Sequence, residues 1–289
     1  MKAEFIHEKN KSYFNLNLIF SPIVGFILLI IGETVGSMVF TPIRRLLPSS
    51  AFTGHVLELF SFIFISLAVL LWARAIERSP WLGLGFRKKG ASRDFLKGWG
   101  IGAAMLITCT FLLMAVGAVT ISKVNFTPTL LAQFLIIMIA WSIQGTTEEI
   151  LVRGWMFPSL SAKHNIPVGI IASSLFFAAI HLGNNAISFI SLVDLFLFGV
   201  LTCLIMLKTG NIWVISGIHA AWNCFQGNVF AFPVSGSDTG AAFLEVNTKG
   251  PEWLSGGQFG VEGSVISLLV QGVMIAWLIY DLYFKNKAK

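Results

Sequence analysis

The chain has 289 residues, of which 55% are apolar and only 12% are charged. A soluble domain carries roughly 25% Asp, Glu, Lys and Arg, so this chain has too little polar surface to be covered by water. Its 26 phenylalanines are spread along the sequence and are not gathered in one anchor. This composition excludes a soluble enzyme, a disordered chain and a secreted disulfide scaffold, and it predicts an all-α polytopic membrane protein.

The apolar segments give the expected order of elements. A bilayer core is about 30 Å thick, and about 20 helical residues cross it. Eight segments meet that length, which makes residues 1–289 a single integral membrane domain; they are residues 16–40, 56–75, 98–121, 132–157, 166–186, 187–207, 211–231 and 264–284. The Gly-rich stretch 232–262 is expected to be a solvated loop, although a lid is the alternative.

The net charge of +6 does not indicate nucleic-acid binding. Seven of the 20 basic residues fall between two apolar segments, in residues 74–97, as is typical of charges that orient helices in a bilayer. With the N-terminus inside, the inner segments carry 15 Lys and Arg and the outer segments carry four. We therefore expect both termini in the cytoplasm and the lipid bilayer as the surroundings of the chain.

The fourth apolar segment contains the run QGTTEEILVR, residues 144–153. Ionisable groups at membrane depth are costly and are functional candidates by default. Glu149 and Arg153 are four apart, so they share a helix face and can pair. Glu148 points about 100° away and is left without that partner, which suits it to act as a general base. The alternative is that both glutamates belong to a buried salt-bridge network.

Two other apolar segments carry polar groups at the same spacing. Phe177 and His181 are four apart, so the phenyl ring can wall one side of the imidazole. His219 and Asn223 form a polar stripe on an otherwise apolar helix and must find partners in the membrane. Centring the segments on the bilayer places these groups at depths compatible with Glu148, which favours a hydrolytic site. The isolated acids Glu33 and Asp194 are expected to hydrogen-bond a neighbouring helix.

The chain resembles the CPBP family in three motifs that occur in the family's order. They are Glu148-Glu149-x-x-x-Arg153, Phe177-x-x-x-His181 and His219-x-x-x-Asn223. This family comprises the type II CAAX prenyl endopeptidases and the bacteriocin-processing intramembrane proteases, and it is also called the abortive-infection family. The resemblance covers about residues 130–230, the expected catalytic core. It implies an eight-helix intramembrane endopeptidase with its active site inside the bundle.

The resemblance also implies roles for the motif residues. Glu148 would activate the attacking water with help from His181, and His219 and Asn223 would stabilise the oxyanion. The supporting residues would be Glu149, Arg153 and Phe177. The family is also described as metalloproteases, and Glu148, His181 and His219 could compose a zinc site. Because the sequence has no HExxH helix, a glutamate-activated water without a cofactor is the first expectation.

The substrate implied by the resemblance is a membrane-embedded or membrane-associated peptide, prenylated or not, and the implied location is a bacterial plasma membrane. Two other functions compete with the peptidase. One is a non-catalytic bacteriocin-immunity or scaffolding protein, against which the complete motif set argues. The other is a proton-coupled transporter that uses Glu148 and Glu149 as a relay. Many such transporters contain internal repeats, and this sequence shows none.

Overall fold

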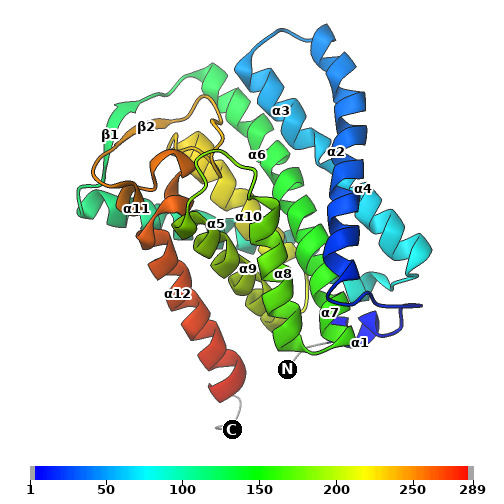
Figure 1. Ribbon diagram of the computed structural model, residues 1–289. Coiled ribbons are helices and arrows are strands. Elements are labelled where there is room, and N and C mark those ends of the chain that lie inside the picture. The colour runs from blue at the N-terminus through cyan, green and yellow to red at the C-terminus, as the bar shows by residue number, and fades with distance from the viewer. Residues whose placement is uncertain (1–3, 286–289) are drawn as a thin grey trace.

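The protein is a helical bundle in a computed structural model that describes residues 4–285 (Figure 1). Within these residues, six helices are long and apolar enough to cross a membrane: Phe20–Leu46, Ala51–Ile76, Ala91–Ala115, Pro128–Lys163, Phe189–Thr209 and Val265–Phe284. The all-α membrane architecture predicted from composition is therefore confirmed. Three lysines used for the predicted orientation lie outside the described residues: Lys2, Lys287 and Lys289.

The elements run in the following order. The first half consists of α1 (Glu4–Lys9), α2 (Phe20–Leu46), α3 (Ala51–Ser61), α4 (Ile63–Leu71), η1 (Trp72–Ile76), η2 (Trp81–Leu84), α5 (Ala91–Ala115), β1 (Val119–Val124) and α6 (Pro128–Glu149). The second half consists of η3 (Ile150–Met156), α7 (Phe157–Lys163), α8 (Ile166–Ile180), α9 (Phe189–Thr209), α10 (Trp213–Cys224), η4 (Phe225–Val229), β2 (Leu244–Thr248), α11 (Glu252–Ser255), η5 (Gly257–Phe259), η6 (Val261–Gly263), α12 (Val265–Ile279) and η7 (Tyr280–Phe284).

Two of the eight expected spans are helices that are shorter than a span. Helix α8 has 15 residues, or about 22 Å at 1.5 Å per residue, which is less than the thickness of a bilayer core. Helix α10 has 12 residues and continues into the wide turn η4. All residues of α10 after Trp213 are buried, so neighbouring helices and not lipid surround it. The apolar segment that contains α10 therefore reflects burial inside the bundle and not contact with lipid.

Glycines allow the central helices to approach closely. A Cβ atom added at Gly98 of α5 would lie 2.1 Å from the backbone oxygen of Val214 in α10. A Cβ atom added at Gly145 of α6 would lie 2.8 Å from the backbone nitrogen of Ala220 in α10. Small residues at such contacts let helix backbones pack together in membranes. This packing brings the end of α6 that carries the two glutamates against His219.

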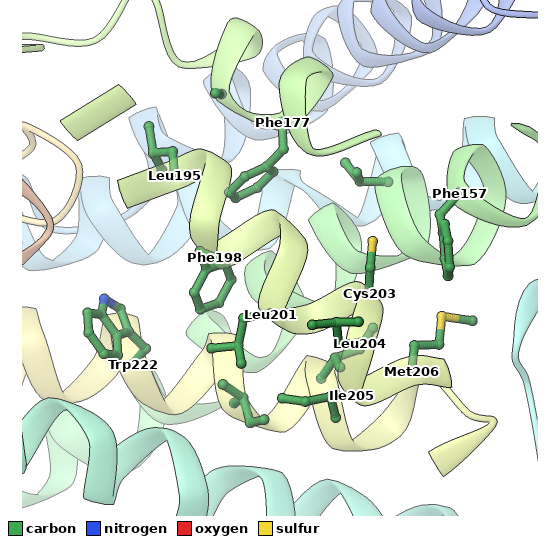
Figure 2. Packing of buried hydrophobic residues seen from close by; sticks show 14 of the residues in the cluster. Phe157, Phe177, Leu195, Phe198, Leu201, Cys203, Leu204, Ile205, Met206 and Trp222 are labelled. Atoms are coloured by element: carbon green, nitrogen blue, oxygen red, sulfur yellow. The ribbon is translucent and has the colours of Figure 1, made fainter. Parts of the chain in front are cut away.

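The apolar core is centred on α9. In its most apolar window 67% of α9 is buried in the protein, against 22% for α2 and for α12, so α9 is central and the other two are peripheral. Figure 2 shows Phe198 of α9 between Phe177 and Trp222, which come from α8 and α10. The ring centroids of Phe177 and Phe198 are 6.1 Å apart, and those of Phe198 and Trp222 are 6.4 Å apart.

The stretch 232–262 is only in part the solvated loop that the sequence predicted, since residues 247–253 are exposed while its two ends are packed against the bundle. Its strand β2 pairs antiparallel with β1, with Lys123 opposite Glu245. Phe232 and Val261 are 1% and 0% exposed. These apolar side chains, interspersed among the glycines, anchor the segment against the bundle. Part of it lines the cavity described below, as a lid would.

A buried ion pair holds α1 at the end of the bundle where α7 and the last turns of α12 also lie (Figure 1). The Nζ atom of Lys9 lies 2.6 Å from Oε2 of Glu77, and both side chains are fully buried. The other carboxylate oxygen accepts hydrogen bonds from the indoles of Trp72 and Trp155, at 3.0 and 2.9 Å. The N-terminal segment is thereby connected to the helix that carries Arg153.

Candidate active site

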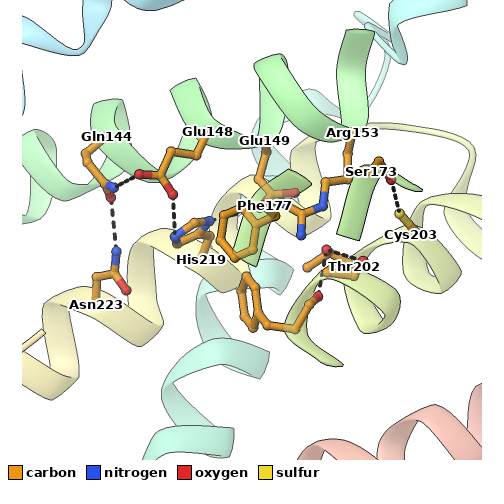
Figure 3. A network of polar contacts seen from close by, with 12 residues as sticks. Gln144, Glu148, Glu149, Arg153, Ser173, Phe177, Thr202, Cys203, His219 and Asn223 are labelled. Carbon is orange, nitrogen blue, oxygen red and sulfur yellow. Dashed lines mark hydrogen bonds and ion pairs between the residues drawn. The ribbon is translucent and has the colours of Figure 1, made fainter. Parts of the chain in front are cut away.

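A chain of charged groups links α6, η3 and α10 at the centre of the bundle (Figure 3). The Nη1 atom of Arg153 donates to Oε1 of Glu149 at 3.1 Å, and both side chains are fully buried. The same carboxylate oxygen lies 2.9 Å from Nδ1 of His219. The ion pair predicted from the four-residue spacing is confirmed. The histidine that joins it comes from a helix 70 residues further along the chain.

Glu148 has a different environment from its neighbour. Its Oε1 accepts a hydrogen bond of 2.7 Å from the side-chain amide of Gln144. Within the described residues its Oε2 accepts no hydrogen bond, and this atom lies 3.5 Å from Nε2 of His219. Glu148 lines a cavity, whereas Glu149 does not. One carboxylate oxygen is therefore held by Gln144, while the other lies beside His219 without a hydrogen bond from the described residues.

The imidazole of His219 bridges the two glutamates. Nδ1 bonds to Glu149 while Nε2 faces Glu148. The rings of Phe198 and Phe177 lie edge-on to it, with centroid distances of 5.1 and 6.0 Å. The bond to Glu149 and the two phenyl rings fix the orientation of the imidazole. A carboxylate bonded to one nitrogen also stabilises the charged form of the ring, from which Nε2 can donate.

His181 lines the same cavity. Its Nδ1 donates to the carbonyl oxygen of Phe177 at 2.7 Å, which leaves Nε2 available. The Phe177 ring lies 4.8 Å from this imidazole and 4.3 Å from the guanidinium carbon of Arg153, so it contacts both groups. No hydrogen bond joins His181 to Glu148 in the part of the chain that the structure describes. Its role as a helper of Glu148 stays a prediction.

Asn223 reaches the site through a residue that the sequence analysis did not single out. Its Nδ2 donates to Oε1 of Gln144 at 3.0 Å, and Gln144 in turn donates to Glu148. Gln144 precedes Glu148 by four positions on α6, the same spacing that identified Glu149 and Arg153 as a pair. This spacing is the signal that could have found it. The two amides tie α10 to the carboxylate of Glu148.

Wide π-helical turns follow both motif helices directly. The turn η3, Ile150–Met156, begins after Glu149, and η4, Phe225–Val229, begins one residue after α10 ends at Cys224. Such turns interrupt the regular spacing of a helix and are frequent at functional sites. A periodicity of 3.6 residues does not reveal them, so the sequence predicted regular helix in both stretches.

All four predicted catalytic residues line one cavity of about 270 Å³: Glu148, His181, His219 and Asn223. The cavity is bounded by side chains of α2, α3, α4, α6, η3, α8, α9 and α10 and by the stretch 232–262. Of the three supporting residues, only Phe177 reaches the cavity wall. The tertiary structure thus assembles in one place groups that lie on three separate helices.

Two of the other carboxylates that line the cavity, Glu262 and Asp194, are buried. Glu262 accepts hydrogen bonds from the indole of Trp222 at 3.2 Å and from the backbone and hydroxyl of Ser235 at 2.9 and 2.8 Å. Burial raises the pKa of Glu262 above its ordinary value. Asp194 of α9 interacts with Ser267 and Gln271 of α12, in keeping with the helix–helix role expected for it. Glu262 was missed because the sequence placed it in a loop.

The residues proposed as zinc ligands do not fit a zinc site in this arrangement. Among residues 4–285, no three His, Cys, Asp or Glu side chains are grouped closely enough to hold a metal ion. The Nδ1 atoms of His219 and His181 bond to Glu149 and to a backbone carbonyl, which are partners that metal-bound histidines commonly have. What argues against zinc is therefore only that the three side chains do not converge. A zinc ion needs Glu148, His181 and His219 to converge on one point. The mechanism derived below contains no metal step.

One protein family matches the region that carries the site. Residues 130–225 match the family model described as Type II CAAX prenyl endopeptidase Rce1-like. The match includes every residue of the three motifs, from Glu148 to Asn223. None of the curated proteins matches the chain.

Proposed function

We propose that this chain, whose residues 130–225 form an Rce1-like domain of the type II CAAX prenyl endopeptidase family, hydrolyses a peptide bond with a water molecule activated by Glu148. The chain is a multi-pass integral membrane protein, and its family is a protease family with membrane-associated protein substrates. The observation that carries the proposal is that Glu148 lines the cavity and that its Oε2, beside His219, accepts no hydrogen bond from the described residues.

The first step requires a base. A water in the cavity can donate to Oε2 of Glu148, while Oε1 stays bonded to Gln144. As the water oxygen attacks the scissile carbonyl carbon, its proton passes to the carboxylate. The new C–O bond forms a tetrahedral intermediate with a negative oxygen. The hydrogen bond from Gln144 keeps the carboxylate in place, so the base does not need to reorganise.

The second step requires donors for the oxyanion and a proton for the leaving amine. His219 and Asn223 lie one turn apart on α10 and both line the cavity, so they are placed to donate to the oxyanion. Glu149 holds the imidazole of His219, and Arg153 holds Glu149. When the C–N bond breaks, Glu148 returns the proton to the nitrogen, and the carboxylate is regenerated.

The location of the termini belongs to the same proposal. The excess of Lys and Arg in segments on one side of the bilayer supports cytoplasmic termini. The proposed membrane, a bacterial plasma membrane, follows from the family resemblance alone. A reporter protein that fluoresces only in the cytoplasm, fused to the C-terminus, checks this topology. The proposed orientation predicts a fluorescent fusion.

The decisive experiment compares the purified protein with its Glu148→Gln variant on a library of membrane-proximal peptides. We expect Glu148→Gln to lower the rate of cleavage by about 10²–10⁴-fold, because it removes the base and keeps the size of the side chain. In water labelled with ¹⁸O, the new C-terminal carboxyl group should carry the label. The matched control is Glu252→Gln, which changes an exposed carboxylate of α11 outside the cavity. A Glu148→Gln variant that cleaves at the wild-type rate overturns the mechanism.

A further inference from the structure

The cavity that contains Glu148 is strongly acidic. Six of the chain's 14 acidic residues line it, and no lysine or arginine within the described residues does. The six are Glu33, Glu58, Glu148, Asp194, Asp238 and Glu262. The chain as a whole is basic, with a net charge of +6, so its composition does not explain this concentration of carboxylates.

The carboxylates form a path from the surface to the base. Glu33, Glu58 and Asp238 are exposed, and they also line a second hollow of about 520 Å³ between α2 and α3, in which Arg44 is the one cation among the described residues. The two hollows share these three residues and therefore adjoin each other. Asp194, Glu262 and Glu148 lie further inside. A chain segment that enters between α2 and α3 passes the first three carboxylates before it reaches the last three.

Asp194 shows that the inner part of this path lacks a positive partner. Its side chain belongs to the cavity wall, the residue is only 1% exposed, and its Oδ1 accepts no hydrogen bond from any described residue. A buried carboxylate is costly unless it is paired and hydrogen-bonded. The interactions with Ser267 and Gln271 supply no positive charge. A cationic N–H donor in the cavity would satisfy both requirements.

The distribution of the carboxylates indicates which kind of cation would fit the cavity. No three of them, with or without the histidines, are grouped closely enough within residues 4–285 to hold a metal ion. Carboxylates spread along a path match a positive group that is part of an extended chain. A cleft lined by charge of one sign also concentrates ligands of the opposite sign.

We propose that this cavity selects peptide segments that carry a positive charge, a Lys or Arg side chain or a free N-terminal ammonium group, close to the bond that is cleaved. This inference rests on the proposed function, since it names the substrate class of the same site. Acidic segments would be disfavoured, because their carboxylates would meet further acidic side chains along the wall. The preference follows from the residues around the base and not from the base itself.

The test measures peptide binding in the Glu148→Gln background, in which the peptide stays intact. Three fluorescent peptides differ at one point: an N-acetylated peptide with one Lys, the same peptide with norleucine, and the norleucine peptide with a free amino terminus. We expect at least one charged peptide to bind about tenfold more tightly than the acetylated norleucine peptide at low salt, with a smaller difference at high salt. The two charged peptides distinguish a side-chain cation from a terminal one.

Substitutions of residues that line the cavity identify which carboxylates cause the preference for charged peptides. Adding Asp194→Asn should remove most of the preference for the charged peptide and leave the affinity for acetylated norleucine unchanged. The double variant Glu58→Gln/Asp238→Asn changes two exposed residues and serves where Asp194→Asn fails to fold. Glu252→Gln is the matched control outside the cavity.

The outcomes separate this inference from the proposed function. Equal affinities for all three peptides overturn the charge preference, as does an equal loss of the preference in Glu252→Gln. If the charged peptide binds selectively but the wild-type protein does not cleave it, the selectivity stands and the peptidase proposal fails. If uncharged peptides bind and are cleaved as well as charged ones, the peptidase proposal stands and the selectivity fails.

Discussion

At the scale of single residues, two adjacent glutamates have opposite environments. Glu149 is fully buried between Arg153 and His219, whereas Glu148 keeps one oxygen free at a cavity wall. A rotation of about 100° per helical residue is enough to produce this difference. Glu148 is therefore suited to act as the base, and Glu149 is suited to hold its neighbours in place.

Removing one partner of the buried pair should destabilise the protein. We expect Glu149→Ala or Arg153→Ala to lower the free energy of unfolding by about 3–5 kcal/mol, because each strands an uncompensated charge. Glu148→Gln should cost much less, since its carboxylate has no guanidinium partner. Thermal unfolding in detergent measures all three variants.

A double variant provides the control for that prediction. Glu149→Leu combined with Arg153→Met removes both charges, and it should recover part of the stability lost in the single variants. His219 then loses its carboxylate partner, so activity should stay low even where stability returns. Equal melting temperatures for Glu148→Gln, Glu149→Ala and Arg153→Ala would show that the ion pair does not stabilise the fold.

At the scale of elements, α10 decides how the site is assembled. It carries His219 and Asn223, and it packs against α5 and α6 through glycines. The wide turns η3 and η4 follow the two motif helices and change the direction of the side chains beyond them. His219 and Asn223 lie within the regular part of α10, whereas the Glu149–Arg153 pair joins the last residue of α6 to the turn η3.

Adding one methyl group between α6 and α10 should harm catalysis. In Gly145→Ala the new Cβ would lie 2.8 Å from the backbone nitrogen of Ala220, so the helices must separate. Because Glu148 and His219 come from these two helices, we expect the cleavage rate to fall by about 10²-fold. Cleavage assays on the purified variant measure the loss.

The matched control is Gly100→Ala on α5. A Cβ atom there would meet nothing within 4 Å, so the substitution should leave the rate unchanged and stabilise the helix by about 0.5–1 kcal/mol. If Gly145→Ala retains full activity, the close contact of α6 and α10 is not what positions the site.

At the scale of the whole molecule, histidines and carboxylates from several helices line one cavity. Among residues 4–285, no three of them are grouped closely enough to hold a metal ion. We therefore expect active, purified protein to contain less than stoichiometric zinc and to keep its activity through a chelation series. Elemental analysis alongside the activity assay checks this. One zinc per chain, lost in step with activity, would overturn the glutamate-activated water and leave the peptidase proposal standing.

The membrane class, the three motif pairs and the Glu149–Arg153 ion pair were predictable from the sequence. Each of them depends on composition or on spacing within one helix, and both can be read along the chain. Apolar length alone did not separate α10, which is buried in protein, from helices that contact lipid.

The links between helices were not predictable from the sequence. His219 bonds to Glu149 across 70 residues, and Asn223 bonds to Gln144 across 79. The stretch 232–262 places Glu262 in the cavity wall, although its composition resembles that of a loop. Such contacts depend on how closely helix backbones approach and on which faces meet. These are properties of packing between distant segments, and spacing along one segment carries no record of them.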